Sequence, residues 1–435
     1  MAARTQVMEA VETLGYRVTL GDVAASTGLA LPEARRELLT LAQEGEGHLQ
    51  VSGRGDISYS FSPEFRQILN RKQRQSRWAQ IRRKIWNACL YLFRISFGIL
   101  LVVSIVLIAL ALIALQMASR GEQSNNRRGG GMPIFFWPHL WVGNPFWAPY
   151  PSYPQTRQRR VEQHRSDSSE KEMSFLEAVY SFLFGDGNPN ADLEEERYRL
   201  IGQQIRQSDG VISGEQVLPY LEVEPNSPQL EYEDYMFPIL VKFDGQPQVN
   251  ETGDIVYVFP ELQVQASERK PRRVPTVLEE QRWPFSLAPQ SKLVLAGGLG
   301  GLNFVLALIL FSARDQVAVL AAESGILALI SPLIGLLMAY GTLFLTVPLL
   351  RWFTLRWRNQ RLAARNQRRH TWAEQLQDPS PHLQTKLAFA QELGQQQLVS
   401  EEETIYSTDR DLIEQRDYEL DDPRFRSLLS NEPSS

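Results

Sequence analysis

The chain has one cysteine among its 435 residues, and this scarcity excludes several kinds of site. Cys89 alone can neither close an intramolecular disulfide nor supply the several thiolates of an iron–sulfur cluster or a cysteine-based zinc site. The five histidines are scattered, and no two of them have metal-ligand spacing. The sequence therefore predicts no metal site and no cofactor.

Motifs that carry enzyme chemistry are also missing. No glycine-rich phosphate loop stands between a strand and a helix, and no serine lies in a nucleophile elbow. Residues 186–192 place oxygen-bearing side chains at alternate positions, as a calcium loop does, but Ala191 and Arg197 occupy positions that need glycine and a bidentate glutamate. We therefore expect a protein that is not an enzyme, with no evident small-molecule substrate and with a helix-capping turn at 186–192.

Three long apolar runs predict an integral membrane protein, with membrane lipid as a partner. They cover about residues 95–117, 293–312 and 326–350, and each is long enough to cross a bilayer. No run carries a central carboxylate or basic residue that would indicate an ion path. Gly297 and Gly301, four residues apart in the second run, predict close packing of membrane helices, with flexible filler as the alternative because the motif is common.

Basic residues flank these runs. Residues 67–94 predict a basic interfacial helix that leads into the first span, and the positive-inside rule places the N-terminus in the cytoplasm. Residues 266–292 form a basic linker. Residues 351–435 form a basic and then polar tail, which we expect to be solvated with helical patches near 383–395 and 400–417. Ser400 with Glu403 makes a capping box at the second patch. A full crossing by the first span would put the middle of the chain outside, although the basic linker favours the inside. Within the aromatic, proline-rich and flexible linker at 118–171, residues 132–153 could lie in the interface or dip into the bilayer. We prefer a cytoplasmic middle segment.

Residues 1–66 predict a winged-helix domain. Apolar spacing indicates three helices, the second opened by a Thr19–Asp22 capping box and the third by Pro32. The period then changes to two on either side of Gly53–Asp56, which predicts a β-hairpin. Three helices followed by a hairpin form the winged-helix variant of helix-turn-helix.

Residues 172–265 predict a second copy of this domain. The hairpin sequence Gly55-Asp56-Ile57 with Tyr59 and Phe61 recurs as Gly253-Asp254-Ile255 with Tyr257 and Phe259. Ser213 with Gln216 repeats the capping pattern, and possible helices lie at about 190–207, 214–221 and 231–243. The alternative is that two unrelated hairpins share a short motif by chance.

The charge balance of both segments favours protein binding over DNA binding. Residues 1–62 carry five basic and eight acidic side chains, and residues 172–265 carry four basic and eighteen acidic ones. This balance lacks the basic face that phosphate binding requires, which makes nucleic acid an unlikely partner and favours a protein with a basic surface. The expected contact residues are Glu194, Glu195 and Glu196, whereas Tyr257 and Phe259 of the second hairpin are expected to be structural. If the N-terminal domain binds DNA instead, its contacts would be Arg35, Arg36 and Arg54.

Three short motifs resemble a known family. They are the segments 184–190 (FGDGNPN), 243–247 (FDGQP) and 255–260 (IVYVFP). Together with the basic entry to the first span, they look like a poorly characterised family of membrane proteins of cyanobacteria and chloroplasts, over roughly residues 90–350. Plant members sometimes carry the label "iron–sulfur cluster biosynthesis". The resemblance implies a thylakoid or plasma membrane of a cyanobacterium, or a plastid membrane, and supplies no catalytic residues.

The sequence thus predicts an α-helical membrane protein with α+β soluble parts, namely two winged-helix-like domains and about three transmembrane helices. The expected function is a membrane-anchored adaptor or assembly factor that binds proteins through the winged-helix domains. One alternative is a membrane-tethered transcription regulator. A second alternative is a component of a transporter or channel.

Overall fold

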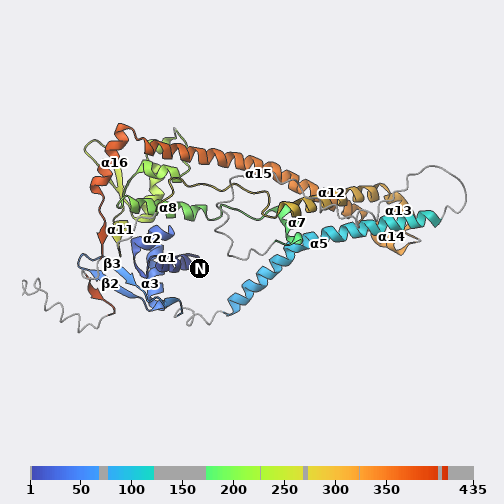
Figure 1. Cartoon of the computed structure of the whole chain (residues 1–435), viewed down its shortest axis with the longest axis horizontal. Helices are drawn as coiled ribbons and strands as arrows, with labels where there is room; N and C mark the ends of the chain where they lie inside the picture. Colours follow the sequence, from blue (N-terminus) through green and yellow to red (C-terminus); the bar gives the residue numbers. More distant parts are fainter. Residues whose placement is uncertain are drawn as a thin grey trace, which may run out of the picture. The chain divides into compact units, whose positions relative to one another are not determined.

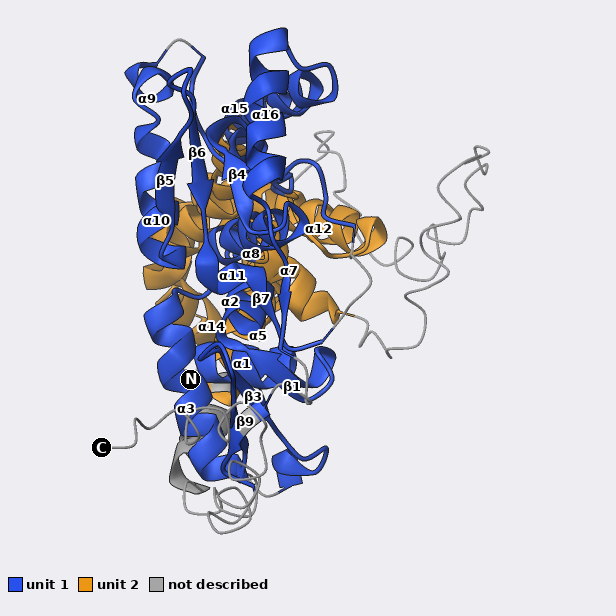
Figure 2. Ribbon diagram, turned by 90° about the vertical axis from the view of Figure 1, so that its left-hand side faces the viewer, with its two compact units in different colours: residues 1–84, 187–283, 356–435 blue, residues 85–186, 284–355 orange. Residues whose placement is uncertain are grey.

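The computed structural model describes residues 2–67, 77–121, 173–225, 227–267, 273–322, 324–399 and 404–409. These residues form two compact units, coloured separately in Figure 2. Unit 1 comprises residues 1–84, 187–283 and 356–435, and unit 2 comprises residues 85–186 and 284–355. The described chain is mostly helical with a few small sheets, and three of its helices are long and apolar enough to cross a membrane.

The N-terminal lobe of unit 1 has three helices and a hairpin. Thr19 and Asp22 form the expected capping box, and Pro32 lies in the first turn of the third helix. The elements are α1 (Ala2–Thr13), β1 (Arg17–Thr19), α2 (Leu20–Thr27), α3 (Leu31–Gly45), β2 (His48–Ser52) and β3 (Ile57–Ser60).

The middle lobe of unit 1 follows a similar order. Ser213 N donates to Gln216 Oε1 at 2.9 Å, which is one half of the second expected capping box. The expected helices at about 214–221 and 231–243 are a 3-10 helix and a short series of helical turns. The elements are α8 (Leu193–Gln207), β4 (Val211–Ser213), η4 (Gly214–Tyr220), α9 (Pro228–Glu231), η5 (Asp234–Met236), α10 (Phe237–Phe243), β5 (Gln246–Val249), β6 (Ile255–Val258), α11 (Pro260–Gln263) and β7 (Val264–Gln265).

The two lobes correspond in detail. The strand orders are β1-β3-β2 and β4-β6-β5, and Tyr59 and Tyr257 pair with equivalent residues of the first strands. Phe61 N donates to Tyr16 O at 2.9 Å, and Phe259 N donates to Gly210 O at 2.8 Å. The rings of Phe61 and Phe259 occupy the space where a Cβ would project from Gly47 and Gly245.

The lobes share one hydrophobic core, which corrects the expectation of two separate domains. Helix α2 packs on α8 (Figure 1), where a Cβ at Gly202 would lie 2.9 Å from Ala25 Cα. Side chains from both lobes, including Val23, Leu38, Ile201 and Phe243, belong to the same buried cluster. The predicted start of the second domain is also wrong, because residues 175–184 form α7 (Phe175–Phe184) in unit 2.

The described part of the C-terminal tail, up to residue 409, packs on strands of the two lobes, which corrects the expectation of a solvated helical tail there. Helix α16 (Pro381–Leu393) contacts β4 and β6, and β8 (Gln397–Leu398) pairs with β7. Within 400–417, where helix was expected, β9 (Thr404–Ser407) is a strand on the outer edge of β2. Leu49 N donates to Thr408 Oγ1 there, whereas Pro247 at the corresponding position of β5 has no N–H to donate.

Unit 2 contains the apolar helices. The third predicted span corresponds to α14, the turn η6 with Pro332, and α15, which continues through Pro348 well beyond residue 350. Near mid-span, Ser104 Oγ donates to Asn303 Oδ1 at 2.8 Å, a buried polar contact between α5 and α12. The elements are α5 (Arg77–Gly121), α7, α12 (Gln290–Ser312), α13 (Arg314–Leu320), α14 (Gly325–Ile330), η6 (Ser331–Leu333) and the first part of α15 (Ile334–Gln377).

Glycine packing in α12 differs from the prediction. A Cβ at Gly297 would be 3.6 Å from the Phe182 ring, whereas a Cβ at Gly301 would meet nothing within 4 Å. The closest approach is at Gly300, where a Cβ would lie 2.2 Å from Phe344 Cε1. Among the described residues, the close packing of α12 therefore lies at Gly300 and not at Gly301.

Several expectations fall outside the described residues. They concern the start of the basic interfacial helix at 68–76, most of the aromatic linker at 118–171, residues 268–272 of the basic linker, and the tail beyond 409.

Candidate functional site

The basic half of α15 lies against acidic residues of unit 1. Arg365 donates from Nε to Glu280 Oε1 at 2.8 Å, and its NH2 group contacts the other carboxylate oxygen. Arg369 NH1 lies 3.0 Å from Glu280 Oε1, and the side chains of Arg369 and Glu280 are only 1% and 5% exposed. Arg368 pairs with Glu224 and His370 with Glu279, both at 3.0 Å. The basic run that follows the third span is therefore largely engaged within the chain.

Arg369 is held by backbone carbonyls as well as carboxylates. Its Nε donates to Leu221 O and its NH1 to Leu278 O, both at 3.1 Å, and NH2 donates to Glu222 Oε1 at 3.2 Å. Burial by itself would raise the pKa of Glu280, but the Arg365 hydrogen bond and the Arg369 charge hold that pKa below its ordinary value. A buried guanidinium with these partners is a structural anchor.

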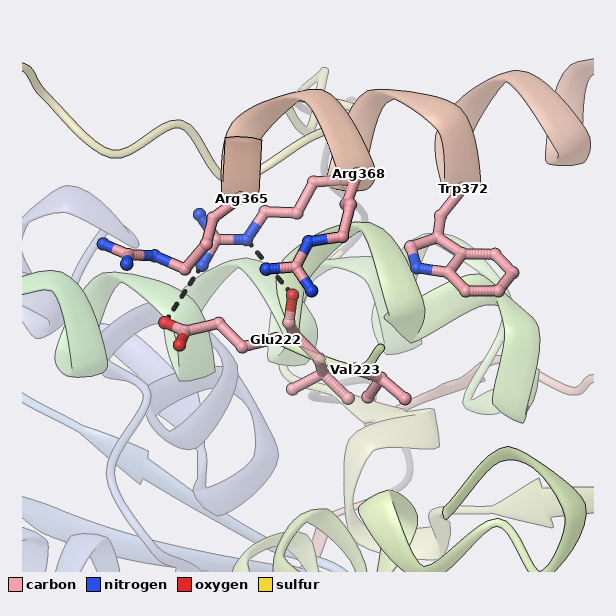
Figure 3. Close-up of a pocket in the computed structure, with 7 residues that line it drawn as sticks. Glu222, Val223, Arg365, Arg368 and Trp372 are labelled. Atoms are coloured by element: carbon pink, nitrogen blue, oxygen red, sulfur yellow. Dashed lines mark hydrogen bonds and ion pairs between the residues drawn. The ribbon is translucent and has the colours of Figure 1, made fainter. Parts of the chain in front are cut away.

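A small pocket lies beside this anchor, shown in Figure 3. Arg365, Arg368 and Trp372 of α15 line one side of it, and Glu222 and Val223 line the other. Its volume of about 10 Å³ matches about one water molecule. This pocket is too small for a metabolite.

Three asparagines hold the segment 280–283 by its backbone. Each side-chain amide donates to a carbonyl and accepts from the N–H of the same residue. Asn366 binds Glu280, with distances of 3.1 and 3.0 Å, and Asn359 binds Trp283, with distances of 2.9 and 3.0 Å. Asn190 binds Gln281 in the same way, at 2.7 and 2.8 Å. These paired bonds fix the course of a segment that has no regular secondary structure.

Gly185 and Asp186 of the motif at 184–190 make their contacts within unit 2. Gly185 has φ +81, and a Cβ there would lie 2.4 Å from Arg351 NH2. Asp186 Oδ2 accepts from Leu287 N at 2.7 Å and from Ser181 Oγ at 2.6 Å. The expected helix cap is wrong, because Asp192 makes no side-chain cap bond and Asn190 binds Gln281 instead.

A buried lysine forms a second ionic cluster in unit 1. Lys386 of α16 is 4% exposed and donates to Glu215 at 2.9 Å and to Glu233 at 2.7 Å. Burial by itself would lower the pKa of Lys386, but the two glutamates raise it above its ordinary value. Tyr257, predicted as a structural residue of the wing, is buried and donates to Glu233 at 2.7 Å. Phe259, two residues further along the chain, is fully buried. Both residues therefore have the structural role that was expected.

The three predicted contact acids lie in the first turn of α8. Glu194 and Glu195 are exposed, and Glu196 is half-buried and pairs with Arg199. Glu195 accepts from Gln6 Nε2 at 2.5 Å. Glu195 and Glu196 also line an open cleft of about 560 Å³ between α1 and α8, together with Glu9, Asp192 and Arg273 among others. The structure therefore places these acids where the two lobes meet.

The three arginines of the DNA-binding alternative do not converge on one unpaired patch. Arg35 pairs with Glu261 of the middle lobe and Arg36 with Glu37, both at 3.4 Å. Arg54 is exposed at the hairpin turn. Each of the two helix arginines thus has an acidic neighbour.

The anchoring roles of Arg365, Arg369, Lys386 and the three asparagines were not predicted. For the arginines the available signal was charge: seven basic residues lie between Arg351 and Arg369, and residues 172–265 upstream carry eighteen acidic side chains. Among the described residues, no group of three or more His, Cys, Asp or Glu could hold a metal ion.

Comparison with known proteins identifies the family. The chain is 35% identical to the uncharacterized chloroplastic protein At5g03900 of Arabidopsis thaliana, over 442 aligned positions that cover 98% of this chain and 82% of the relative. The chain therefore belongs to the same family as this chloroplastic protein. No family model matches the chain, and no solved structure matches it. The chloroplastic relative and the three apolar helices are compatible with a plastid membrane protein.

Proposed function

We propose that this protein is a membrane-anchored adaptor or assembly factor, in which two winged-helix domains related by duplication bind protein partners. The equivalent strand orders and the matching Phe61 and Phe259 hydrogen bonds support the duplication. A winged-helix pair with an acidic surface fits a protein partner with a basic surface better than it fits nucleic acid.

The observation that carries the proposal is the exposure of the acids at the start of α8. The described acids that face α15 are largely neutralised within the chain, whereas Glu194 and Glu195 are exposed at the junction of the lobes. Exposed carboxylates at a junction of two rigid lobes can steer and orient a basic partner. The small pocket beside Arg369 offers no room for a substrate.

The proposed location is a photosynthetic membrane: a thylakoid or plasma membrane of a cyanobacterium, or a plastid membrane, with the N-terminus on the cytoplasmic or equivalent side. The chloroplastic relative supports a photosynthetic cell. The basic residues at 71–94 support the orientation through the positive-inside rule. The transcription-regulator and transporter alternatives stay predictions.

The test is quantitative affinity purification of the full chain from its own membranes. The variant carries Glu194→Gln, Glu195→Gln and Glu196→Gln. The control carries Glu374→Gln, Asp378→Asn and Glu392→Gln, which removes the same charge from exposed acids elsewhere. We expect partners that co-purify with the native chain and the control at low salt to fall at least about fivefold with the variant. Equal recovery with all three proteins would contradict the proposal.

A further inference from the structure

The outward face of α10 is apolar. Phe237 and Val241 lie one helical turn apart and are 69% and 65% exposed, and Pro238 between them is also exposed. On the other face, Ile239 and Phe243 are buried in the core that the two lobes share. The core of unit 1 is therefore complete without Phe237 and Val241. Large apolar side chains exposed together on one face mark an interaction site.

Exposed carboxylates lie at both ends of this helix. Asp234 lies three residues before Phe237, and Asp244 lies three residues after Val241; both are exposed. Lys242, the single cation of α10, has its Nζ 3.6 Å from the centre of the Tyr198 ring. Burial lowers the pKa of Lys242, and the charges of Glu194, Glu33 and Glu195 oppose that shift. The predicted contact acids of α8 therefore lie close to the end of the apolar helix.

We propose that the α10 face of Phe237, Pro238 and Val241 is the docking surface for a protein segment that carries apolar side chains flanked by Lys or Arg. This inference rests on the proposed adaptor function and names the contact and the class of partner. Burial of the two apolar side chains would supply affinity, and the acids would select a basic flank. The same acids disfavour an anionic lipid surface as the occupant.

The corresponding position in the N-terminal lobe provides a matched comparison. Counting from the glycines Gly47 and Gly245, Leu39 of α3 corresponds to Phe237 and is 44% exposed. Arg35 and Arg36 precede Leu39 within one turn, each paired with a carboxylate, so a basic flank would meet arginines there and not unpaired acids. The proposed partner therefore fits α10 and not α3.

The test is peptide binding to the full chain in nanodiscs of zwitterionic lipid, with empty nanodiscs as reference. The probe is a fluorescent synthetic helix of 14 residues, with leucines on one face and lysines on its flanks. We expect Phe237→Ser with Val241→Ser to raise the Kd at least about tenfold, as expected when buried apolar side chains are lost. Leu39→Ser with Ile57→Ser should leave the Kd unchanged. A peptide with glutamates in place of the lysines should bind at least about tenfold more weakly.

Three results would overturn the inference. They are equal affinity of the native chain and the α10 variant, an equal loss in the control, and equal binding of the glutamate peptide. If Glu194→Gln with Glu195→Gln and Glu196→Gln weakens lysine-peptide binding while the α10 variant does not, the adaptor proposal stands and the docking surface is wrong. Unchanged thermal unfolding of the α10 variant excludes misfolding as the cause of lost binding.

Discussion

Asp22 of the N-terminal lobe and Arg206 of the middle lobe form a buried ion pair, with a nitrogen–oxygen distance of 2.5 Å. The Asp22 side chain is fully buried, and that of Arg206 is 15% exposed. Asp22 also caps α2 through Thr19 N and accepts from Ala266 N at 3.1 Å. One residue of a local capping box thereby also joins the two lobes.

Replacing Asp22 by Asn tests how strongly the lobes depend on this pair. The amide keeps an oxygen for the cap but leaves the Arg206 charge without its counter-ion. Breaking a buried pair costs about 3–5 kcal/mol, so we expect the melting temperature to fall by about 6–12 °C or more. Differential scanning calorimetry of the full chain in detergent measures the change. The control is Asp315→Asn, whose side chain is 93% exposed and which should melt as the native chain does. Equal melting of both variants would show that the pair is dispensable.

The Glu280 anchor predicts a pH dependence. Its pKa is lowered in the folded state, so the stabilisation is fully present above the unfolded-state pKa of about 4.3 and is lost as the pH falls through the folded-state value. The variant Glu280→Gln removes the charge at every pH. We therefore expect it to melt well below the native chain at pH 7, and the difference to shrink only below about pH 4.3. A difference that stays constant down to pH 3 would contradict the assigned role of the carboxylate.

Replacing each of two neighbouring glycines of α12 by alanine should change the stability of the protein by different amounts. Gly300→Ala places a methyl group against Phe344, and such overpacking costs about 1–3 kcal/mol. Gly301→Ala meets no neighbour within 4 Å and should be neutral or slightly stabilising. Thermal unfolding in detergent compares the two variants. Equal destabilisation by both would place the packed face of α12 elsewhere.

The elements that the sequence predicted well are those fixed by local chemistry. The capping pairs Thr19–Asp22 and Ser213–Gln216 and the Tyr59 and Tyr257 hairpins need only residues close in sequence, and all are present. The three apolar helices were also predicted, because the length and apolar character of a membrane span can be read from one continuous segment.

The missed features depend on partners distant in sequence. Residues 404–407 become a strand because the edge of β2 is open to them, although Ser400 and Glu403 resemble a helix start. Helix α7 was assigned to the acidic domain by position, although its run of Phe, Leu, Val and Tyr matches the apolar core that it joins in unit 2. Lys386 carries no sequence signal, since its partners Glu215 and Glu233 are more than 150 residues away.

The shared core has a consequence for membrane topology. A single hydrophobic core that contains Val23 and Ile201 cannot be divided by a bilayer, so both lobes must lie on the same side of the membrane.

The most direct test of the account is the sidedness of the two lobes. Cys89 is replaced by Ser, and single cysteines are placed at the exposed positions Gln43 and Gln229, one in each lobe. Intact, oriented membrane vesicles are labelled with an impermeant maleimide before and after permeabilisation. The account predicts that both cysteines are labelled from the same side, so that both lobes can bind one partner there. Labelling of Gln43→Cys from one side and Gln229→Cys from the other would contradict the shared core and the adaptor built on it.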